Sequence, residues 1–547
     1  MRGRSPRIIL VVGLTLLVGP ILPAQTGQRE IPKSEIGRQL IVKLGCAGCH
    51  TIADPAYKGL PKSGPDLRRI ASKTNPGWIL KWLTAPRELR PTTWMPHFFD
   101  EADAEEIRGT VAFLWESSQQ VEYPSPPAGN SGRGEELFDS VGCTGCHIRD
   151  ASAKRADFPE HYRLQGPNLV HLGSKVNAAW LFTWLKDPRQ YAPTTLMPNL
   201  RLSDQEAADL TAYLMESLAS EQGNLEYSIE DEDRVEAGRE AIELYGCYGC
   251  HAIAGFEEAG KHAGEWPSLE SFSEHGMSGL PSFNLSAHEL DSVRAAADSF
   301  LGEGDGALAE GRKLITQFNC RGCHEIEDWG GAIQATIDDV GMLPPTLRSE
   351  GSRVRPEWLS AYVHDPTIAT LRPWLSVRMP TFDLSEKEIG TVVTYFSALE
   401  ENELRALPAE PPKAWNVTVG REMFNLLQCG SCHGGAKDAW PRELGTADLA
   451  PSLDAANRRL RYEWISLWIK DPQGLIPGTK MPTFFPQSQT GVFNSPFASL
   501  LDSPRFAEPR ARLMEHFGSE QELTSFLDEA DAVIEVMSDY IWSLGKE

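Results

Sequence analysis

Ten cysteines occur in five pairs, and a histidine follows every pair. The five C-x-x-C-H copies begin at residues 46, 143, 247, 320 and 429. Two thiols about one helical turn apart can each add to a vinyl group of one haem, and the neighbouring histidine can then ligate its iron. This is the attachment pattern of c-type haem. A redox dithiol or half of a zinc site does not require a histidine in every copy.

The sequence therefore predicts five haem c groups with iron centres. The predicted thioether anchors are Cys46, Cys49, Cys143, Cys146, Cys247, Cys250, Cys320, Cys323, Cys429 and Cys432. The predicted proximal ligands are His50, His147, His251, His324 and His433.

A Met-Pro dipeptide follows four of the five motifs. The methionines are Met95, Met197, Met379 and Met481, which lie 45, 50, 55 and 48 residues after the preceding motif histidine. A lone methionine is more often a core residue than a ligand, but this recurrence favours a sixth ligand to iron. Thioether ligation stabilises ferrous iron and raises the reduction potential.

The third repeat departs from this pattern. Leu280 occupies the methionine position before Pro281, and the distance from Pro267 to Leu280 is 13 residues, compared with 30 for Pro65 to Met95. Leucine cannot ligate iron. Met277 is our predicted replacement ligand, and His275, His262 or an open position are the alternatives.

Recurring segments surround each motif and must position it. An amphipathic helix precedes it, as in 36–45, 135–141 and 420–427, and a Pro-x-Leu segment follows. Four repeats continue with an aromatic helix whose aromatic residues are four apart and share a face, such as Trp78 and Trp82. An acidic closing helix ends the unit, as in 385–396, where Ser385 and Glu388 form a predicted capping box. The alternation typical of strands is weak, so we predict an all-α fold.

This order of helix, C-x-x-C-H, proline loop, Met-Pro and closing helix resembles the class I c-type cytochrome family. The resemblance implies five tandem cytochrome c-like domains, the third shortened. It also implies that a proline carbonyl accepts a hydrogen bond from each proximal histidine. The implied acceptors are Pro65, Pro167, Pro267, Pro345 and Pro451.

Changes in composition between the repeats give the domain limits. The predicted domains are 32–120, 131–220, 234–302, 307–400 and 416–547, the last with an insertion at about 487–520 before a closing helix at about 521–544. Residues 1–24 have a basic start, an apolar stretch and Ala24, which together are typical of a secretory signal peptide. We therefore expect a periplasmic or otherwise exported protein that has no membrane span after cleavage.

Charge restricts the partners. The chain of 547 residues has 76 acidic and 52 basic residues, a formal net charge of −24. This excess argues against nucleic acid and favours redox proteins with basic docking surfaces as electron donor and acceptor. The predicted function is electron transfer without catalysis. The alternatives are a peroxidase or small-ligand reductase centred on the third haem, and a cytochrome subunit of a larger respiratory or dehydrogenase complex, such as a membrane-bound respiratory complex.

Overall fold

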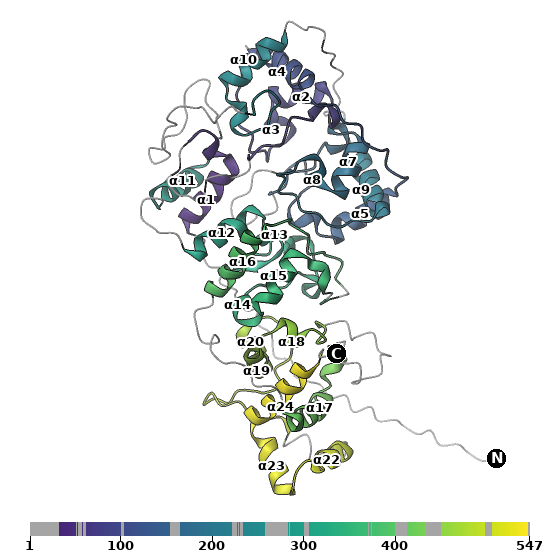
Figure 1. Ribbon diagram of the computed structural model, residues 1–547, viewed down its shortest axis with the longest axis vertical. Helices are drawn as coiled ribbons and strands as arrows, with labels where there is room; N and C mark the ends of the chain where they lie inside the picture. The colour runs from purple at the N-terminus through teal and green to yellow at the C-terminus, as the bar shows by residue number, and fades with distance from the viewer. Residues whose placement is uncertain are drawn as a thin grey trace, which may run out of the picture.

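The computed structural model describes residues 32–50, 52, 57, 62–99, 103–153, 165–220, 227, 229, 234–257, 283, 285–299, 306–369, 371–372, 375–399, 413–433, 450–497 and 506–544. This part of the chain is mostly helical and forms five helical units that extend along the long axis of the molecule (Figure 1). Each unit is built around two packed helices.

Three units pair the first and the closing helix of one and the same repeat, as expected. In the second unit α5 (Ser131–Ser140) packs against α9 (Asp204–Ser217), in the fourth α12 (Ala307–Gln317) against α16 (Glu386–Leu399), and in the fifth α17 (Ala414–Leu426) against α24 (Ala530–Ser543).

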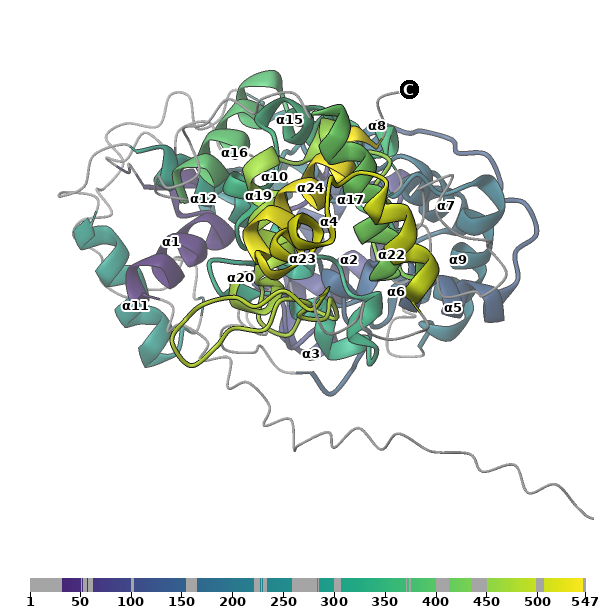
Figure 2. The ribbon, with the colours of Figure 1, turned by 90° about the horizontal axis from the view of Figure 1, so that it is seen from below.

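The remaining two units exchange their helices. Helix α1 (Lys33–Leu44) packs against α11 (Ala287–Ser299), and α10 (Arg234–Leu244) packs against α4 (Ala104–Glu116). Figures 1 and 2 both show α1 beside α11, on the opposite side of the molecule from α5 and α9. The first and third predicted domains are therefore interleaved in the structure. We call the two resulting bodies the α1/α11 unit and the α4/α10 unit.

A glycine nine residues before the first cysteine marks the crossing point of every helix pair. A side chain at any of these glycines would collide with the facing helix; the glycines are Gly37, Gly134, Gly238, Gly311 and Gly420. Gly37 meets the carbonyl of Ser292 on α11, and Gly238 meets Gly109 on α4. The exchanged pairs thus use the same glycine-mediated contact as the sequential ones.

Shorter elements complete the units. The helices are α2 (Pro76–Thr84), α3 (Pro86–Leu89), α6 (Leu172–Lys175), α7 (Ala178–Lys186), α8 (Pro188–Tyr191), α13 (Cys320–Cys323), α14 (Glu350–Arg353), α15 (Pro356–His364), α18 (Ala456–Arg459), α19 (Tyr462–Lys470), α20 (Pro472–Leu475), α22 (Ala507–Met514) and α23 (Glu520–Asp528). Among the described residues, 3-10 helices outside the attachment motifs include Ile70–Ser72, Ala332–Thr336, Val340–Met342 and Pro366–Ile368.

Within the part of the chain that the structure describes, a β-hairpin departs from the all-α expectation. Strands β1 (Glu325–Ile326) and β2 (Trp329–Gly330) pair antiparallel directly after the fourth motif. The two residues between them, Glu327 and Asp328, have φ of 56° and 66°. Positive φ at both turn positions is the geometry of a tight two-residue hairpin.

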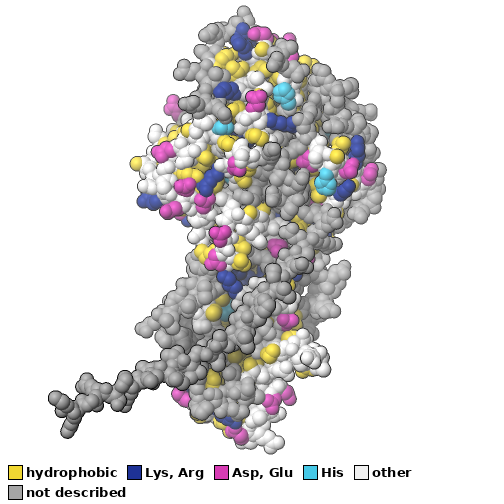
Figure 3. All heavy atoms as spheres, turned by 180° about the vertical axis from the view of Figure 1, so that it is seen from behind, with side chains coloured by type: hydrophobic (Ala, Val, Ile, Leu, Met, Phe, Trp, Pro, Cys, Tyr) yellow, Lys and Arg dark blue, Asp and Glu magenta, His cyan; other side chains and the backbone are white. Residues whose placement is uncertain are grey.

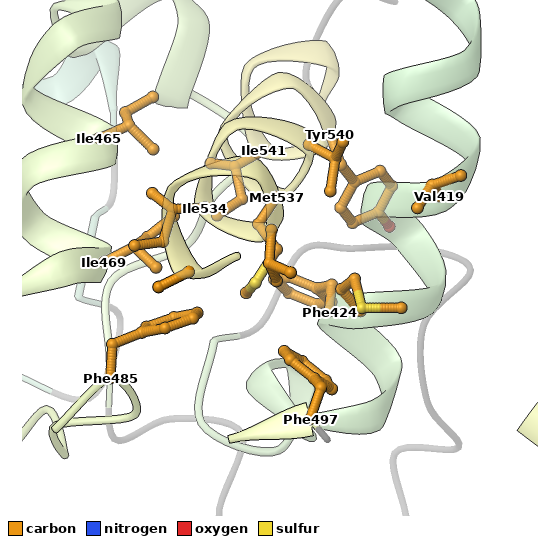
Figure 4. Close-up of a cluster of buried hydrophobic side chains, with 14 of the residues drawn as sticks. Val419, Phe424, Ile465, Ile469, Phe485, Phe497, Ile534, Met537, Tyr540 and Ile541 are labelled. Carbon is orange, nitrogen blue, oxygen red and sulfur yellow. The ribbon is translucent and has the colours of Figure 1, made fainter. Parts of the chain in front are cut away.

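The predicted closing helix of the fifth unit is broken in two. Helix α23 ends at Asp528, and α24 begins at Ala530 after a non-helical Glu529. The break lets Leu523 and Leu527 of α23 enter the same core as Ile534 of α24. Phe497, from the predicted insertion, is also fully buried in this core, beside Phe424 (Figure 4).

Candidate haem attachment sites

Each C-x-x-C-H motif forms a single tight turn at the end of its helix. A residue with positive φ precedes the first cysteine, and these residues are Gly45, Gly142, Gly246, Asn319 and Gln428. The histidine N–H then donates to the carbonyl of the first cysteine at 2.8–3.0 Å in all five motifs. The four short turns η1 (Cys46–Gly48), η5 (Cys143–Gly145), η8 (Cys247–Gly249) and η13 (Cys429–Ser431), with α13, therefore bring two thiols and one imidazole onto one small loop.

Burial disfavours dithiol redox chemistry at the first cysteine of each motif. None of the ten forms a disulfide. Burial raises the pKa of Cys46, Cys143, Cys247, Cys320 and Cys429 to about 12. Dithiol exchange needs a thiolate, and burial disfavours the thiolate form of these five cysteines.

A proline carbonyl holds the imidazole in each of the four sites where the structure describes the loop. Nδ1 donates to the carbonyl oxygen of the expected proline for His147 and Pro167 at 2.8 Å, His324 and Pro345 at 2.7 Å, and His433 and Pro451 at 2.9 Å. This confirms three of the expected pairs. Donation from Nδ1 leaves Nε2 to face the ligand position.

Pro65 was expected to serve His50, and this expectation is wrong. Its carbonyl accepts from Nδ1 of His251 at 2.9 Å. The cause is the helix exchange, because the third motif follows α10 and α10 packs on α4. Pro267, which was expected to serve His251, lies outside the described residues, as do Met277, His275, His262 and Leu280.

The aromatic helices stack their two aromatic rings, as their spacing indicates. Ring centroids are 6.4 Å apart for Trp78 and Trp82, 5.2 Å for Trp180 and Trp184, 4.6 Å for Trp358 and Tyr362, and 4.9 Å for Trp464 and Trp468. Interplanar angles of 14–21° show that the two rings of each pair lie nearly parallel.

Two of the Met-Pro methionines lie against these aromatic helices. Trp82 Nε1 donates to Sδ of Met95 at 2.8 Å, and Trp184 Nε1 donates to Sδ of Met197 at 2.9 Å. Met379 and Met481 are half-buried in the equivalent segments. A feature absent from our sequence analysis fixes three of the four: a threonine two residues earlier accepts from the methionine N–H at 3.2–3.3 Å, namely Thr93, Thr195 and Thr479.

The fourth motif has an ion network that our sequence analysis missed. Arg321, inside C-x-x-C, is fully buried and stacks over Trp329 at 3.6 Å. Its guanidinium pairs with Glu327 at 2.6 Å, and Glu327 also pairs with Arg312 at 2.5 Å. The hairpin turn thus fixes the attachment loop to α12.

Attachment loops contact one another in pairs. A Cβ built on Gly145 would lie 2.6 Å from Sγ of Cys323, and one built on Gly249 would lie 3.1 Å from Sγ of Cys49. Asn319 Nδ2 donates to Sγ of Cys146 at 3.2 Å. The second motif therefore meets the fourth, and the first meets the third.

The glycine before the second cysteine makes this approach possible. It is present in the four paired loops, as Gly48, Gly145, Gly249 and Gly322, and a side chain on any of them would press on the partner loop or on Asn319 beside it. In the fifth motif the position is Ser431, and Cys432 is exposed. The residue before the second cysteine, glycine in four motifs and serine in the fifth, could have predicted which loops contact another attachment loop.

A second kind of contact joins the α4/α10 unit to the second unit. Asn177 N donates to the carbonyl of Lys73 at 3.1 Å, and Thr74 Oγ1 donates to that of Lys175. The ammonium of Lys73 lies 4.5 Å from the ring centroid of Trp180, while that of Lys175 lies 5.8 Å from Trp78. Each unit thus inserts a lysine against the aromatic pair of the other.

The fourth and fifth units repeat this reciprocal contact with arginines. Arg355 N donates to the carbonyl of Arg459 at 2.8 Å, and Arg461 N donates to that of Arg353 at 2.9 Å. The guanidinium of Arg353 lies 5.9 Å from the Trp464 ring, and that of Arg459 lies 5.5 Å from Trp358. The contacts together place the sites in the order first, third, second, fourth and fifth.

These contacts test whether the residues fit haem c, which has two propionate groups. Burial lowers the pKa of Lys73 to about 8 and of Arg459 to about 10, and it also lowers the pKa of Lys175 well below its usual value. Nε1 of Trp180 and Trp464, and Nε of Arg353 and Arg459, are buried without a hydrogen-bond partner. Buried cations and donors of this kind require an acceptor, and a haem propionate would supply one. The residues fit the group.

The comparisons with known proteins agree with this geometry. The Cytochrome c family model matches residues 34–118, 131–217 and 308–400. No curated protein and no solved structure matches the chain. Three regions of this mostly helical chain thus match cytochrome c domains, and such domains imply haem-based electron transfer. Among the described helices, none has the length and apolar character needed to cross a membrane.

Proposed function

We propose that the protein is an exported electron carrier with five haem c groups, held by the ten motif cysteines and the five motif histidines. The observation that carries this proposal is the hydrogen bond from a motif histidine to a proline carbonyl, which recurs in four sites at 2.7–2.9 Å. When bound, haem c supplies a one-electron ferric/ferrous couple.

The chain's own residues set the conditions for that couple. The proline carbonyls fix the imidazole orientation and raise its basicity as a ligand. The methionine thioethers favour the reduced state. The aromatic pairs and the unit cores exclude water, and the buried lysines and arginines at the two reciprocal contacts compensate the propionate charge.

Redox proteins are the proposed partners, as donor and acceptor, with basic docking surfaces. The net charge of −24 supports this preference. On the face shown in Figure 3, however, acidic and basic side chains are interspersed rather than gathered in one patch. We therefore expect steering by the overall charge, which salt screens with a Debye length of about 8–10 Å. Reduction by a basic partner protein should slow as ionic strength rises, and a rate that is independent of salt would count against this part.

The direct test is the haem content of the full chain, purified after expression with a cytochrome c maturation system. Intact mass and the absorption of the pyridine haemochrome, formed in alkaline pyridine with the haem still attached to the chain, should both give five haems per chain. A lower count, or cysteines free to react with a maleimide, would contradict the proposal. The Cys429→Ala, Cys432→Ala variant serves as a calibration, because it removes one motif and should lower the count by one.

A further inference from the structure

We propose that Met95 is the sixth ligand of the iron held by His251, so that the third motif and the Met-Pro segment of the first repeat build one site. The atypical site, without a Met-Pro methionine, then belongs to the first motif. This inference rests on the proposed function, because it assigns a ligand to a haem that the third motif would hold.

The proximal side of this site reproduces that of the second unit. In the second unit two backbone hydrogen bonds fasten the proline loop to the motif, from Gly166 N to Cys146 O at 2.9 Å and from Leu169 N to Ile148 O at 2.8 Å. The α4/α10 unit has the same two bonds between separate repeats, from Gly64 N to Cys250 O at 2.9 Å and from Leu67 N to Ala252 O at 2.9 Å.

The distal side is equivalent as well. Met95 follows Pro65 by 30 residues, as Met197 follows Pro167. Its sulfur accepts from a tryptophan of the aromatic helix at 2.8 Å, compared with 2.9 Å for Met197. Met95 packs on the same hydrophobic core as Cys247, just as Met197 packs on the core of Cys143.

The residue before Met95 shows where the two sites separate. Trp94 packs on the core that contains Cys46, whereas Met95 packs on the core that contains Cys247. The core around Cys46 also takes Phe283 and Leu285 from the third repeat. By sequence, Leu280 occupies the methionine position in that repeat. The half of the site that faces the first motif therefore comes from the third repeat, which has no Met-Pro methionine.

The test combines Met95→Ala with the loss of either motif in the full, haem-loaded chain. Cys247→Ala, Cys250→Ala removes the third attachment, and Cys46→Ala, Cys49→Ala removes the first. The readouts are haem count by mass and the number of methionine-ligated irons, from the ferric methionine-to-iron absorption band and electron paramagnetic resonance. Met197→Ala is the control, since it should remove one methionine-ligated iron in every background.

The expected result is a dependence on background. Met95→Ala should remove one methionine-ligated iron when the first motif is missing, and none when the third motif is missing. The opposite pattern would overturn the inference. Failure of the proposed function is distinguishable, because it would appear as too few haems in the unmodified chain.

A second measurement applies if these variants do not mature. A protease site inserted after Pro126, in the exposed segment between α4 and α5, allows the chain to be cleaved there without any change to the motif residues or to Met95. The exchange predicts that both fragments elute together in native gel filtration, because α1 is held by α11 and α4 by α10. Release of a folded fragment that contains residues 32–120 would overturn the inference.

Discussion

The imidazole of His251 donates to the carbonyl oxygen of Pro65 at 2.9 Å, although Pro65 precedes it by 186 residues. In the other three sites the same bond spans 18 to 21 residues. The hydrogen bond at the histidine is the same as in the other sites, but the proline loop that accepts it comes from another repeat. This one hydrogen bond therefore shows two things: the histidine is held as in the other sites, and the first and third repeats have exchanged parts.

Gly64 is expected to affect the third haem and not the first. A side chain at Gly64 would overlap the His251 ring, as one at Gly166 would overlap His147. Gly64→Ala should therefore impair ligation at His251, and Gly166→Ala, the matched variant, ligation at His147. Peptide mass mapping and redox titration of both variants check this. A loss at the peptide that contains Cys46 and Cys49 would contradict it.

Gly145 is expected to be essential for the pairing of the second and fourth loops. Gly145→Val places methyl groups against Sγ of Cys323, and overpacking of this kind costs roughly 1–3 kcal/mol. Calorimetric unfolding of the haem-loaded chain should show that loss. Ser431→Val, in the loop that lacks a partner glycine, should change stability by less than about 0.5 kcal/mol. Equal effects at both positions would argue against a specific loop contact.

Lys73 is expected to tune a reduction potential. A buried cation beside a propionate opposes the ferric charge, so Lys73→Met should lower the potential of one haem by roughly 1 kcal/mol in redox free energy. Lys175→Met should act in the same direction from the other side of the contact. Lys186→Met is the control, because Lys186 pairs with Asp204 at 2.8 Å near the surface. Spectroelectrochemical titration measures these shifts, and a shift that is equal in the control would contradict the assignment.

Asp209 is expected to make the second unit sensitive to acid. Hydrogen bonds from Arg133, at 2.9 and 3.1 Å, and from Asn130 N lower the pKa of this buried carboxyl to about 2. Its ionised form thus stabilises the fold above pH 3.8, the ordinary value, and the contribution is lost as pH falls toward 2. Asp209→Asn should cost about 1–3 kcal/mol at neutral pH. Melting curves should show this difference shrink between about pH 4 and pH 2.

The local features could be predicted from sequence because their determinants lie within a few residues. Ser385 and Glu388 form the expected capping box, with hydrogen bonds of 2.8 and 3.3 Å. The aromatic residues four apart stack, and three of the five proline carbonyls meet the expected histidine. The positions Met277 and Leu280 lie outside the described residues, so the sixth ligand expected from the third repeat stays a prediction.

The helix exchange could not be read from local pattern, because α1 and α10 carry the same glycine-based contact and either closing helix satisfies it. Gly37 fits against Ser292, and Gly238 fits against Gly109. The useful signal was the shortened third repeat, which we interpreted as an atypical site rather than as half of a shared one. The break at Glu529 was missed for a similar reason, since helical periodicity continues across it.

The packing of α4 against α10 also makes the second unit a guest domain. Its chain leaves from the end of α4 and returns at the start of α10, and those two helices lie side by side. An insertion of this kind is tolerated when the ends of the inserted domain can approach one another. The guest can fold on its own contacts as the chain emerges, whereas α1 has to wait until residue 299 is available. Folding should therefore begin with the second unit, and the first motif should be among the last to gain its complete surroundings.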